Sequence, residues 1–368
     1  MRDRGHYSFL WPAMIVIALA LNTPINGSEV PLDRGHGQDA PRHQEEKPDE
    51  TGFDATPFIM DHIGDSHEWH LFTTPDGKHV SIPLPVIVWT KERGLSIFSS
   101  AKLSHSHIHK GYMIPEEGEL KGSIVMVDND GIVIPDKFIL DLSVTKTVTA
   151  MMVSALILIW LFVTMARSYN RYGISPPKGI QGFLEPVVLF IRDDIALPNI
   201  GKQKYEQFMP YLLTVFFFIL INNLMGLIPI APGGANVTGN IAVTMVLALF
   251  TFFVTQISGN RNYWRHIFNT PGIPFWLKPI MIPVELIGLF SKPFALMVRL
   301  FANITAGHII ILSLVSLIFI FGSLVIAPVS VFLVLFMNLL EMLVAFIQAY
   351  VFTLLSALFI GLAVQEEH

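Results

Sequence analysis

The sequence predicts an all-α polytopic membrane protein preceded by a small β-rich segment. Of its 368 residues, 52% are hydrophobic and only 14% are Asp, Glu, Lys or Arg, and the mean hydropathy is +0.54. The apolar residues gather in runs that reach the ~20 helical residues needed to cross a hydrocarbon core. The net charge of -5 gives no indication of a nucleic-acid partner, and the absence of cysteine excludes disulfides and thiol catalysis.

The pattern of the first 55 residues predicts a signal for export, followed by a flexible linker. Arg2 and Arg4 precede a short apolar run at 7–21, and small residues follow, as in a secretory signal peptide at 1–28. A retained anchor helix is the alternative, although the run is short for a full span. Residues 29–55 are polar and charged, which predicts a flexible linker.

Residues 56–140 predict a small β-rich periplasmic segment. Strand-like runs occur at 79–89 and 122–127, and the second ends at the turn signal Asp-Asn-Asp-Gly at 128–131 before another short run at 132–134.

Residues 141–368 predict the membrane domain. Three ordinary spans are expected at about 148–166, 211–228 and 240–257, and an amphipathic piece at 181–194 reads as an interfacial helix. The apolar stretches at 280–325 and 329–363 are longer than a span needs. At ~1.5 Å per residue the first would reach roughly 65 Å, about twice the hydrocarbon thickness. We therefore expect a long, steeply tilted two-helix hairpin over 280–363.

The distribution of Lys and Arg predicts the orientation. Six lie in 166–205 and three in 258–278, whereas the intervening loop at 229–239 has none. Both basic segments should therefore be cytoplasmic, which places the β-rich segment on the outer side of a bacterial inner membrane.

Arg299 is the most informative residue, because it interrupts an apolar run that continues to about 320. A charge near mid-membrane costs at least ~2.5–3.5 kcal/mol, and guanidinium stays charged at any accessible pH. Such a residue indicates ion movement, voltage sensing or counter-ion binding. The alternative is a helix-end arginine that extends to the headgroups.

A polar stripe surrounds Arg299. Glu285, Lys292, Arg299 and Asn303 follow spacings of 7, 7 and 4, so they share one helix face. His308 is nine residues past Arg299, half a turn around, and should face the other way. Two interpretations of Glu285 and Lys292 stay open: they line a path on the cytoplasmic side, or they form an ion pair at the membrane surface near the cytoplasm.

A second stripe follows the last helix, where Asn338, Glu341 and Gln348 share one face. Two polar paths with a permanent cation between them predict two water-filled half-channels that do not connect. Buried Glu341 and His308 can pair and relay a proton. The alternative is that these polar groups only hold helices together.

At these residues the chain resembles subunit a of F-type ATP synthase. The run Arg299-Leu-Phe-Ala-Asn303-Ile-Thr-Ala-Gly-His308 is similar to the signature of that family. So are Glu341 with Gln348, the ending Gln-Glu-Glu-His, and the run Asn-Asn-Leu-Met-Gly-Leu-Ile-Pro at 222–229. The resemblance covers about 148–368, whereas the β-rich segment departs from the minimal family pattern.

The resemblance implies a non-catalytic proton-channel subunit that carries ions, H⁺ or Na⁺, past a rotating c-ring of small hydrophobic subunits. Arg299 would be the stator arginine. Further partners would be the peripheral-stalk subunit b, the rest of the ATP synthase and the lipid bilayer, with no cofactor and no metal. The polar positions of the outer channel would be Asn223, Asn303, His308, Glu341 and Gln348. Gly226 stands where some relatives have an acid, so it cannot be a relay here.

Two other classes of protein remain open on the residues alone. A self-contained secondary transporter should show internal repeats, and no obvious repeat is present. A membrane-anchored sensor or scaffold would explain a histidine-rich region that can bind zinc, although such histidines more often lie at a surface. These histidines are His62, His67, His70, His79, His105, His107 and His109. The last three alternate and would share one face of a strand.

Overall fold

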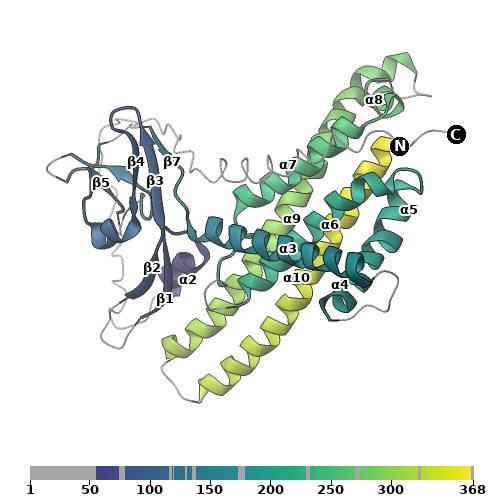
Figure 1. Ribbon diagram of the computed structural model, residues 1–368. Helices are drawn as coiled ribbons and strands as arrows, with labels where there is room; N and C mark the ends of the chain where they lie inside the picture. Colours follow the sequence, from purple (N-terminus) through teal and green to yellow (C-terminus); the bar gives the residue numbers. More distant parts are fainter. Residues whose placement is uncertain are drawn as a thin grey trace, which may run out of the picture.

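The computed structural model describes residues 55–73, 79–115, 118, 120–128, 131–134, 138–172, 179–228, 233–269, 274–321 and 325–365. The predicted signal peptide and nearly all of the predicted linker lie outside these residues. Within them, a β-rich unit is followed by a helical bundle, and the two lie side by side in Figure 1.

Five described helices are long and apolar enough to cross a membrane. They are α3 (Lys146–Tyr172), α6 (Tyr205–Gly226), α7 (Ile241–Ser258), α9 (Lys278–Phe321) and α10 (Ile326–Val364). A short helix, α8 (Arg261–Phe268), joins α7 to α9. These bounds confirm each of the predicted apolar helices, and the chain is a helical polytopic membrane protein.

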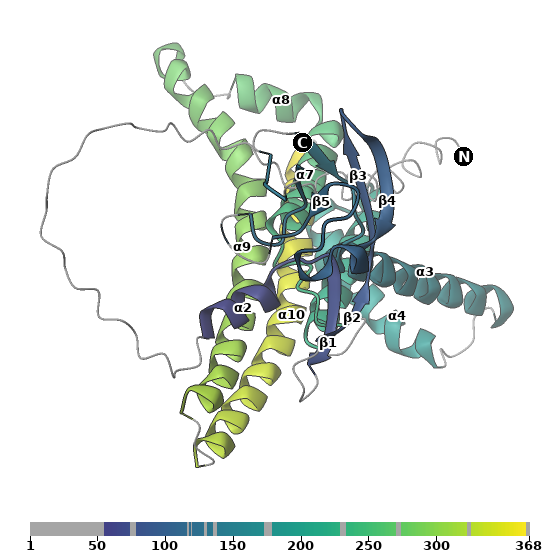
Figure 2. The same ribbon diagram turned by 90° about the vertical axis from the view of Figure 1, so that its left-hand side faces the viewer.

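The hairpin is built from the two longest helices. α9 has 44 residues and runs without a break through Pro283 and Pro293, and α10 has 39. An interior proline costs ~3 kcal/mol, yet α7 and α10 both pack along α9 and favour the continuous helix. In Figures 1 and 2, α3 crosses the hairpin of α9 and α10 at a steep angle. If all of these helices span one bilayer, some of them must therefore be tilted from the membrane normal.

The main apolar core lies where α6 packs against α3, α10 and the segment after α4. The predicted interfacial helix is α4 (Ile180–Phe190), a π-helical turn at Ile191–Ala196 and α5 (Leu197–Ile200). Leu184, Ile191 and Ile195 are buried against the bundle, whereas Phe183 is 76% exposed. The segment is therefore amphipathic, as predicted, but its buried face meets protein.

The β-rich unit contains α2 (Ala55–Ile63) and seven short strands in three small sheets. The strands are β1 (Glu68–Thr73), β2 (His79–Pro83), β3 (Pro85–Thr90), β4 (Gly94–Ser99), β5 (Tyr112–Met113), β6 (Val125–Met126) and β7 (Ile139–Asp141). The sheets pair β1 with β2, β5 with β6, and β3 with both β4 and β7.

Two strand predictions need correction. The run at 79–89 is two strands, β2 and β3, because Pro83 and Pro85 remove N–H donors on either side of Leu84 and interrupt the ladder. The run at 122–127 forms only the two-residue β6, followed by a bridge from Val127 to Val133. The core of the unit nevertheless comes from alternating residues such as Val86 and Val88, as a strand pattern requires.

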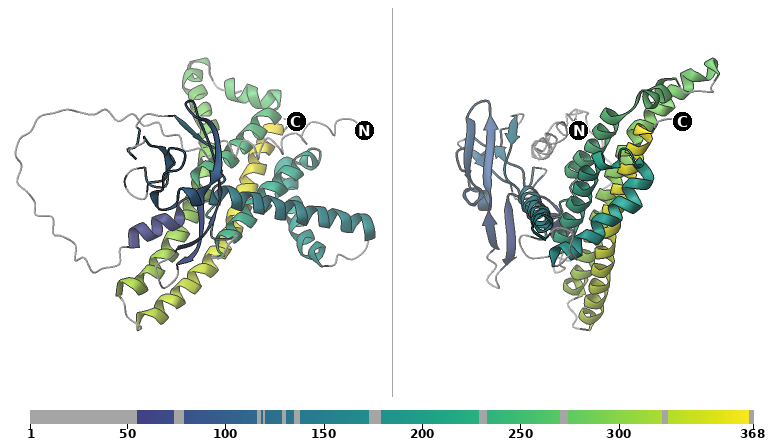
Figure 3. Two further views of the ribbon diagram at one scale, coloured as in Figure 1. Left: turned by 60° about the vertical axis from the view of Figure 1, so that its left-hand side comes forward. Right: turned by 45° about the vertical axis from the view of Figure 1, so that its right-hand side comes forward.

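The β-rich unit is fixed to the bundle at the start of α3. Asp65 Oδ1 accepts a hydrogen bond from Thr147 N (3.0 Å) and Asp65 Oδ2 accepts one from Thr145 Oγ1 (2.7 Å). Ser66 O accepts from Lys146 N (2.9 Å), and Trp69 is buried in the core of the bundle. α2 also packs on α9, and the two helices lie next to each other in Figure 1 and in the left view of Figure 3.

Candidate functional site

A buried histidine–carboxylate pair joins the two helices of the hairpin. His308 Nδ1 on α9 lies 2.5 Å from Glu341 Oε1 on α10. The Glu341 side chain is only 4% exposed and that of His308 15%. The second oxygen, Glu341 Oε2, is buried and has no hydrogen-bond partner among the described residues. A carboxyl group with one free buried oxygen can exchange a proton with a water molecule or with the histidine.

Two glycines make room for this pair. A Cβ on Gly307 would lie 2.9 Å from Glu341 Oε1, closer than side chains normally approach. A Cβ on Gly226 of α6 would lie 3.7 Å from His308 Nε2. The pair is therefore held by backbone that approaches it closely on α9 and α6.

The polar face predicted on α10 is buried from Glu341 onward, whereas Asn338, at its start, is only half-buried. Glu341, Ala345 and Gln348 are all buried. Asn223 of α6 donates to Ala345 O (3.3 Å), midway between Glu341 and Gln348, and accepts a hydrogen bond from Thr238 Oγ1. The structure thus brings four predicted residues, Asn223, His308, Glu341 and Gln348, to one side of the hairpin.

Arg299 lies on the opposite side of α9, as predicted from the spacing to His308. Its side chain is exposed, and Leu296 and Leu300 beside it are buried in the core. Among the residues that the structure describes, Arg299 has no hydrogen-bond or ion-pair partner. Asn303, one turn further, is exposed on the same side. These two residues face outward, away from the buried pair.

Glu285 and Lys292 do not form the surface ion pair that was one of their two interpretations. Lys292 Nζ lies 5.5 Å from the centroid of the Phe359 ring, a cation–π arrangement. Lys292 also lines a small hollow of about 20 Å³ between α7, α9 and α10. Lys292 is half-buried beside this hollow, whereas Arg299, seven residues further along α9, is exposed.

The hollow reaches α8 through Tyr263. Tyr263 OH and Gln256 exchange hydrogen bonds of 3.2–3.4 Å, and both residues line the hollow. Burial raises the pKa of Tyr263 and the nearby Glu285 carboxylate raises it further, whereas the bond to Gln256 acts in the opposite direction. Glu285 lies one helical turn before Leu289, which is another residue that lines the hollow.

Sequence reasoning missed a line of buried hydroxyl groups beside the hollow. Tyr211 OH lies 2.8 Å from Thr251 Oγ1, which in turn lies 3.2 Å from Ser356 Oγ. These residues join α6, α7 and α10. Hydroxyl residues in apolar helices usually bond to their own backbone, so their presence alone does not indicate a site. The spacing of Thr251 and Thr255, one helical turn apart on α7, is the only signal.

The histidine-rich region does not form a metal centre in the described residues, where no three His, Cys, Asp or Glu side chains gather around one point. His67 Nε2 instead donates to Asp141 Oδ2 (2.9 Å), and His109 packs edge-on against Phe98. The expectation that His105, His107 and His109 share a strand face is wrong. A 3-10 turn at Ser104–Ser106 breaks the alternation.

The helical part of the chain matches a known family. A model described as "ATP synthase A chain" matches residues 148–361. The chain belongs to this family. A subunit a of ATP synthase from Chloroherpeton thalassium is 52% identical over 233 residues, which are 62% of this chain and 68% of the relative. One from Myxococcus xanthus is 48% identical over 235 residues, 62% of this chain and 75% of the relative. A "subunit a 2" from Chlorobium luteolum is 51% identical over 243 residues, 64% of this chain and 69% of the relative.

Membership in the family confirms the resemblance seen at Arg299 to His308. The chain is a multi-pass, membrane-sector subunit of a complex that makes ATP, and it is not catalytic on its own. The β-rich unit matches a second model over residues 58–142, described only as "Domain of unknown function (DUF8433)".

Proposed function

We propose that this chain is the stator subunit that conducts protons between the two sides of a bacterial inner membrane and past a rotating ring of small hydrophobic subunits. The observation that carries the proposal is the contrast on α9. A buried, paired His308 faces the bundle, and an exposed, unpartnered Arg299 faces outward. An exposed guanidinium in a membrane helix needs an anionic partner from another chain, and a ring carboxylate is such a partner.

The outer half-channel would run along the buried face of α10. A proton would enter from the periplasm, pass between Glu341 and His308, and reach a ring carboxylate with Asn223, Asn303 and Gln348 lining the path. The free buried oxygen of Glu341 supports this role, because it can receive a proton without breaking the bond to His308. A protonated ring carboxyl group is neutral and can then turn through lipid, whereas an ionised one cannot.

The inner half-channel would be the hollow beside Lys292. Its polar lining residues and the neighbouring Glu285 would release protons to the cytoplasm. Arg299 lies between the two paths along α9 and would favour the ionised form of each arriving ring carboxylate. One charge that crosses ~100 mV supplies ~2.3 kcal/mol, so several protons are needed for each ATP.

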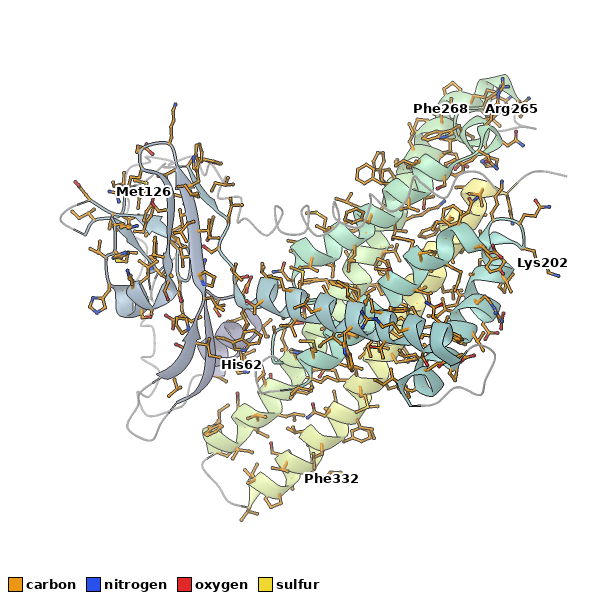
Figure 4. The ribbon with its side chains drawn as sticks, in the orientation of Figure 1. His62, Met126, Lys202, Arg265, Phe268 and Phe332 are labelled. Atoms are coloured by element: carbon orange, nitrogen blue, oxygen red, sulfur yellow. The ribbon has the colours of Figure 1, made fainter. Side chains whose placement is uncertain are left out.

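The orientation follows from the basic residues. Lys202 and Arg265 lie at the same end of the bundle, far from the hairpin turn near Phe332 (Figure 4). We assign that end to the cytoplasm. The β-rich unit, which precedes α3, would then lie in the periplasm after cleavage of a signal peptide. The peripheral-stalk subunit b would complete the stator, and no cofactor, metal or nucleic acid is required.

Purification in mild detergent tests the assembly. We expect a ring of small hydrophobic subunits, subunit b and a soluble ATPase head to co-purify with this chain. The complex in sealed vesicles should make ATP when a proton gradient is imposed, and a sodium gradient alone should not drive synthesis. If a sodium gradient without a proton gradient drives ATP synthesis, the subunit conducts Na⁺ and the proposed proton path is wrong. If the chain purifies alone as an active transporter, the proposal that it is a stator subunit is wrong.

A further inference from the structure

The outer side of the three-stranded sheet is apolar and uncovered in the described structure. The strand registers place its side chains in two rows of three across β4, β3 and β7 and the residue that follows β7. The rows are Ile97, Ile87 and Leu142, and Leu95, Trp89 and Leu140. We call these six residues the outer sheet face. Leu95 is 60% exposed and Ile97 is 59% exposed.

A sheet with one side in water normally carries polar residues on that side. Here the inner side already supplies the core, where Val86, Val88 and Phe98 pack against Leu103 and Tyr112. The outer sheet face has no charged residue and no polar residue in either row. Both sides of the sheet are therefore built for apolar surroundings, and only the inner side has them within the described chain.

The outer sheet face is continuous with the membrane part of the protein. Leu142 N donates to Ile87 O, and Val144 N donates to Pro85 O, so the ladder continues past β7 with the same two-residue period. Val144 therefore lies on the same side as Leu140 and Leu142, and it packs against the apolar core of the membrane helices. In Figure 1, β5 lies on the far side of this sheet, and the helices lie on the side of the outer sheet face.

The distance to the lipid is short and fixed. α3 begins at Lys146, only four residues after Leu142, and its side chains are exposed to the surroundings of the bundle from Met152 (51%) onward. The bonds from Asp65 to Thr145 and Thr147 hold the unit in one orientation on α3. An apolar surface held this way can reach the headgroup region, which is ~5–7 Å thick on each side of the hydrocarbon core.

We propose that the outer sheet face lies on the surface of the same lipid bilayer that α3 crosses, with its apolar side chains at the boundary between headgroups and acyl chains. Trp89, at the centre of one row, is the residue type that favours this boundary. The β-rich unit thus rests on lipid as well as on the membrane helices, which it contacts through α2 and Trp69. The proposal needs only that α3 spans the membrane, so it does not depend on which ion the subunit carries.

A fluorescent label at single cysteines tests the contact. The chain has no cysteine of its own, so Ile97→Cys can be labelled in the assembled complex once cysteines of the other subunits are replaced. The control is Ile108→Cys. It is an isoleucine of similar exposure, 49%, in the loop between η2 (Ser104–Ser106) and β5, on the other side of the sheet. Both complexes are placed in phosphatidylcholine vesicles, with and without lipid that carries a nitroxide near the top of one acyl chain.

We expect the nitroxide lipid to quench the label at position 97 about twofold more than the label at position 108, because an interfacial residue lies only ~5–10 Å into the bilayer. Aqueous iodide should quench the two labels in the opposite order. Equal iodide quenching of both labels would show that the face is in water and would overturn the proposal. Protection of position 97 from both quenchers would mean that another subunit or a second copy covers it, which also overturns the proposal. Leu95→Cys, next to Ile97 on β4, repeats the test if the first variant does not assemble.

Discussion

The two sides of α9 place polar residues in opposite surroundings within nine residues. On the inner side, His308 is nearly buried and meets Glu341 at 2.5 Å. On the outer side, Arg299 is exposed and has no partner in the described chain. The helices α9 and α6 also differ in how much of their apolar surface other parts of the chain cover. Only 11% of the most apolar window of α9 is buried, against 56% for α6.

On one side of α9 the polar residues have partners within the described chain, and on the other side Arg299 has none. On the inner side the carboxyl group and the imidazole share a hydrogen bond, and only Glu341 Oε2 has no partner among the described residues. The outer guanidinium cannot become neutral and gains nothing from lipid. In the proposed mechanism Arg299 therefore acts on a group from another chain, whereas the inner pair acts through residues already in place.

The largest expected effect is at the outer side. Arg299→Ala should abolish ATP synthesis and open a passive proton leak, because no fixed charge would then separate the two half-channels. Arg299→Lys should also fail, since a buried ammonium can lose its proton and lacks the planar fork of guanidinium. The measurements are ATP synthesis and passive proton permeability in vesicles that contain assembled complex.

Val298→Ala is the matched control, because Val298 precedes Arg299 on α9 and is also exposed (37%) but has no charge. It should retain most of the synthesis rate. If Arg299 only stabilises the hairpin, Arg299→Lys will instead be nearly neutral and Arg299→Ala will relieve an insertion cost of ~2.5–3.5 kcal/mol. Substantial synthesis by both assembled variants would remove the stator role.

At the inner side, Glu341→Gln should slow proton flow ~100-fold, the lower end of the range for loss of a positioned proton-transfer group. Assembly should persist, because the amide keeps the shape and can still hydrogen-bond to His308. The exchange variant His308→Glu with Glu341→His keeps one acid and one imidazole at the same contact and should recover part of the rate. Normal ATP-driven pumping by Glu341→Gln alone would rule out the relay.

The contrast on α9 could be predicted from spacing alone. Nine residues at ~100° each place Arg299 and His308 on opposite sides of any regular helix. The single long helix could also be predicted, because no polar loop interrupts 280–321. The family signature around Arg299 led to the same conclusion as the later comparison with known relatives.

Contacts between distant segments could not be predicted. The position of Gly226 beside His308 depends on how α6 crosses α9, and the hollow beside Lys292 depends on three helices and α8. The ends of the short β-strands could be predicted only approximately from the alternation of apolar residues. Prolines at 83 and 85 and the long connections decide where each ladder of hydrogen bonds ends. The roles assigned to the site residues stay predictions until the variants are measured.

A moderate effect is expected at Gly307, which makes room for the inner pair. Gly307→Ala adds a methyl group 2.9 Å from Glu341 Oε1, so Glu341 must move, and overpacking of this kind typically costs ~1–3 kcal/mol. Proton flow should fall, though less than in Glu341→Gln. Gly288→Ala on the same helix meets nothing within 4 Å and should be neutral or slightly stabilising. The measurements are the pumping rate and the thermal stability of both variants. Equal values for Gly307→Ala and Gly288→Ala would show that Gly307 does not make room for the pair.

The smallest effect on transport should come from a second histidine–carboxylate pair that lies outside the membrane helices. His67 Nε2 donates to Asp141 Oδ2 at 2.9 Å, which chemically resembles the contact between His308 and Glu341. Burial alone would raise the pKa of Asp141, but hydrogen bonds from His67 and Ser143 outweigh it and hold this pKa below its ordinary value.

Since the folded pKa of Asp141 is lower than the unfolded value of ~4, this carboxylate stabilises the fold fully above ~pH 4, and the stabilisation is lost as the pH falls through the folded pKa. Asp141→Asn should therefore lower thermal stability at neutral pH and flatten its decline in acid, while proton pumping by the assembled complex stays unchanged. Asp194→Asn, at an exposed carboxylate of the segment after α4, is the control and should leave the acid profile intact. Impaired pumping by a well-assembled Asp141→Asn complex would show that a buried position on α9 and α10 does not distinguish a transporting pair from a structural one.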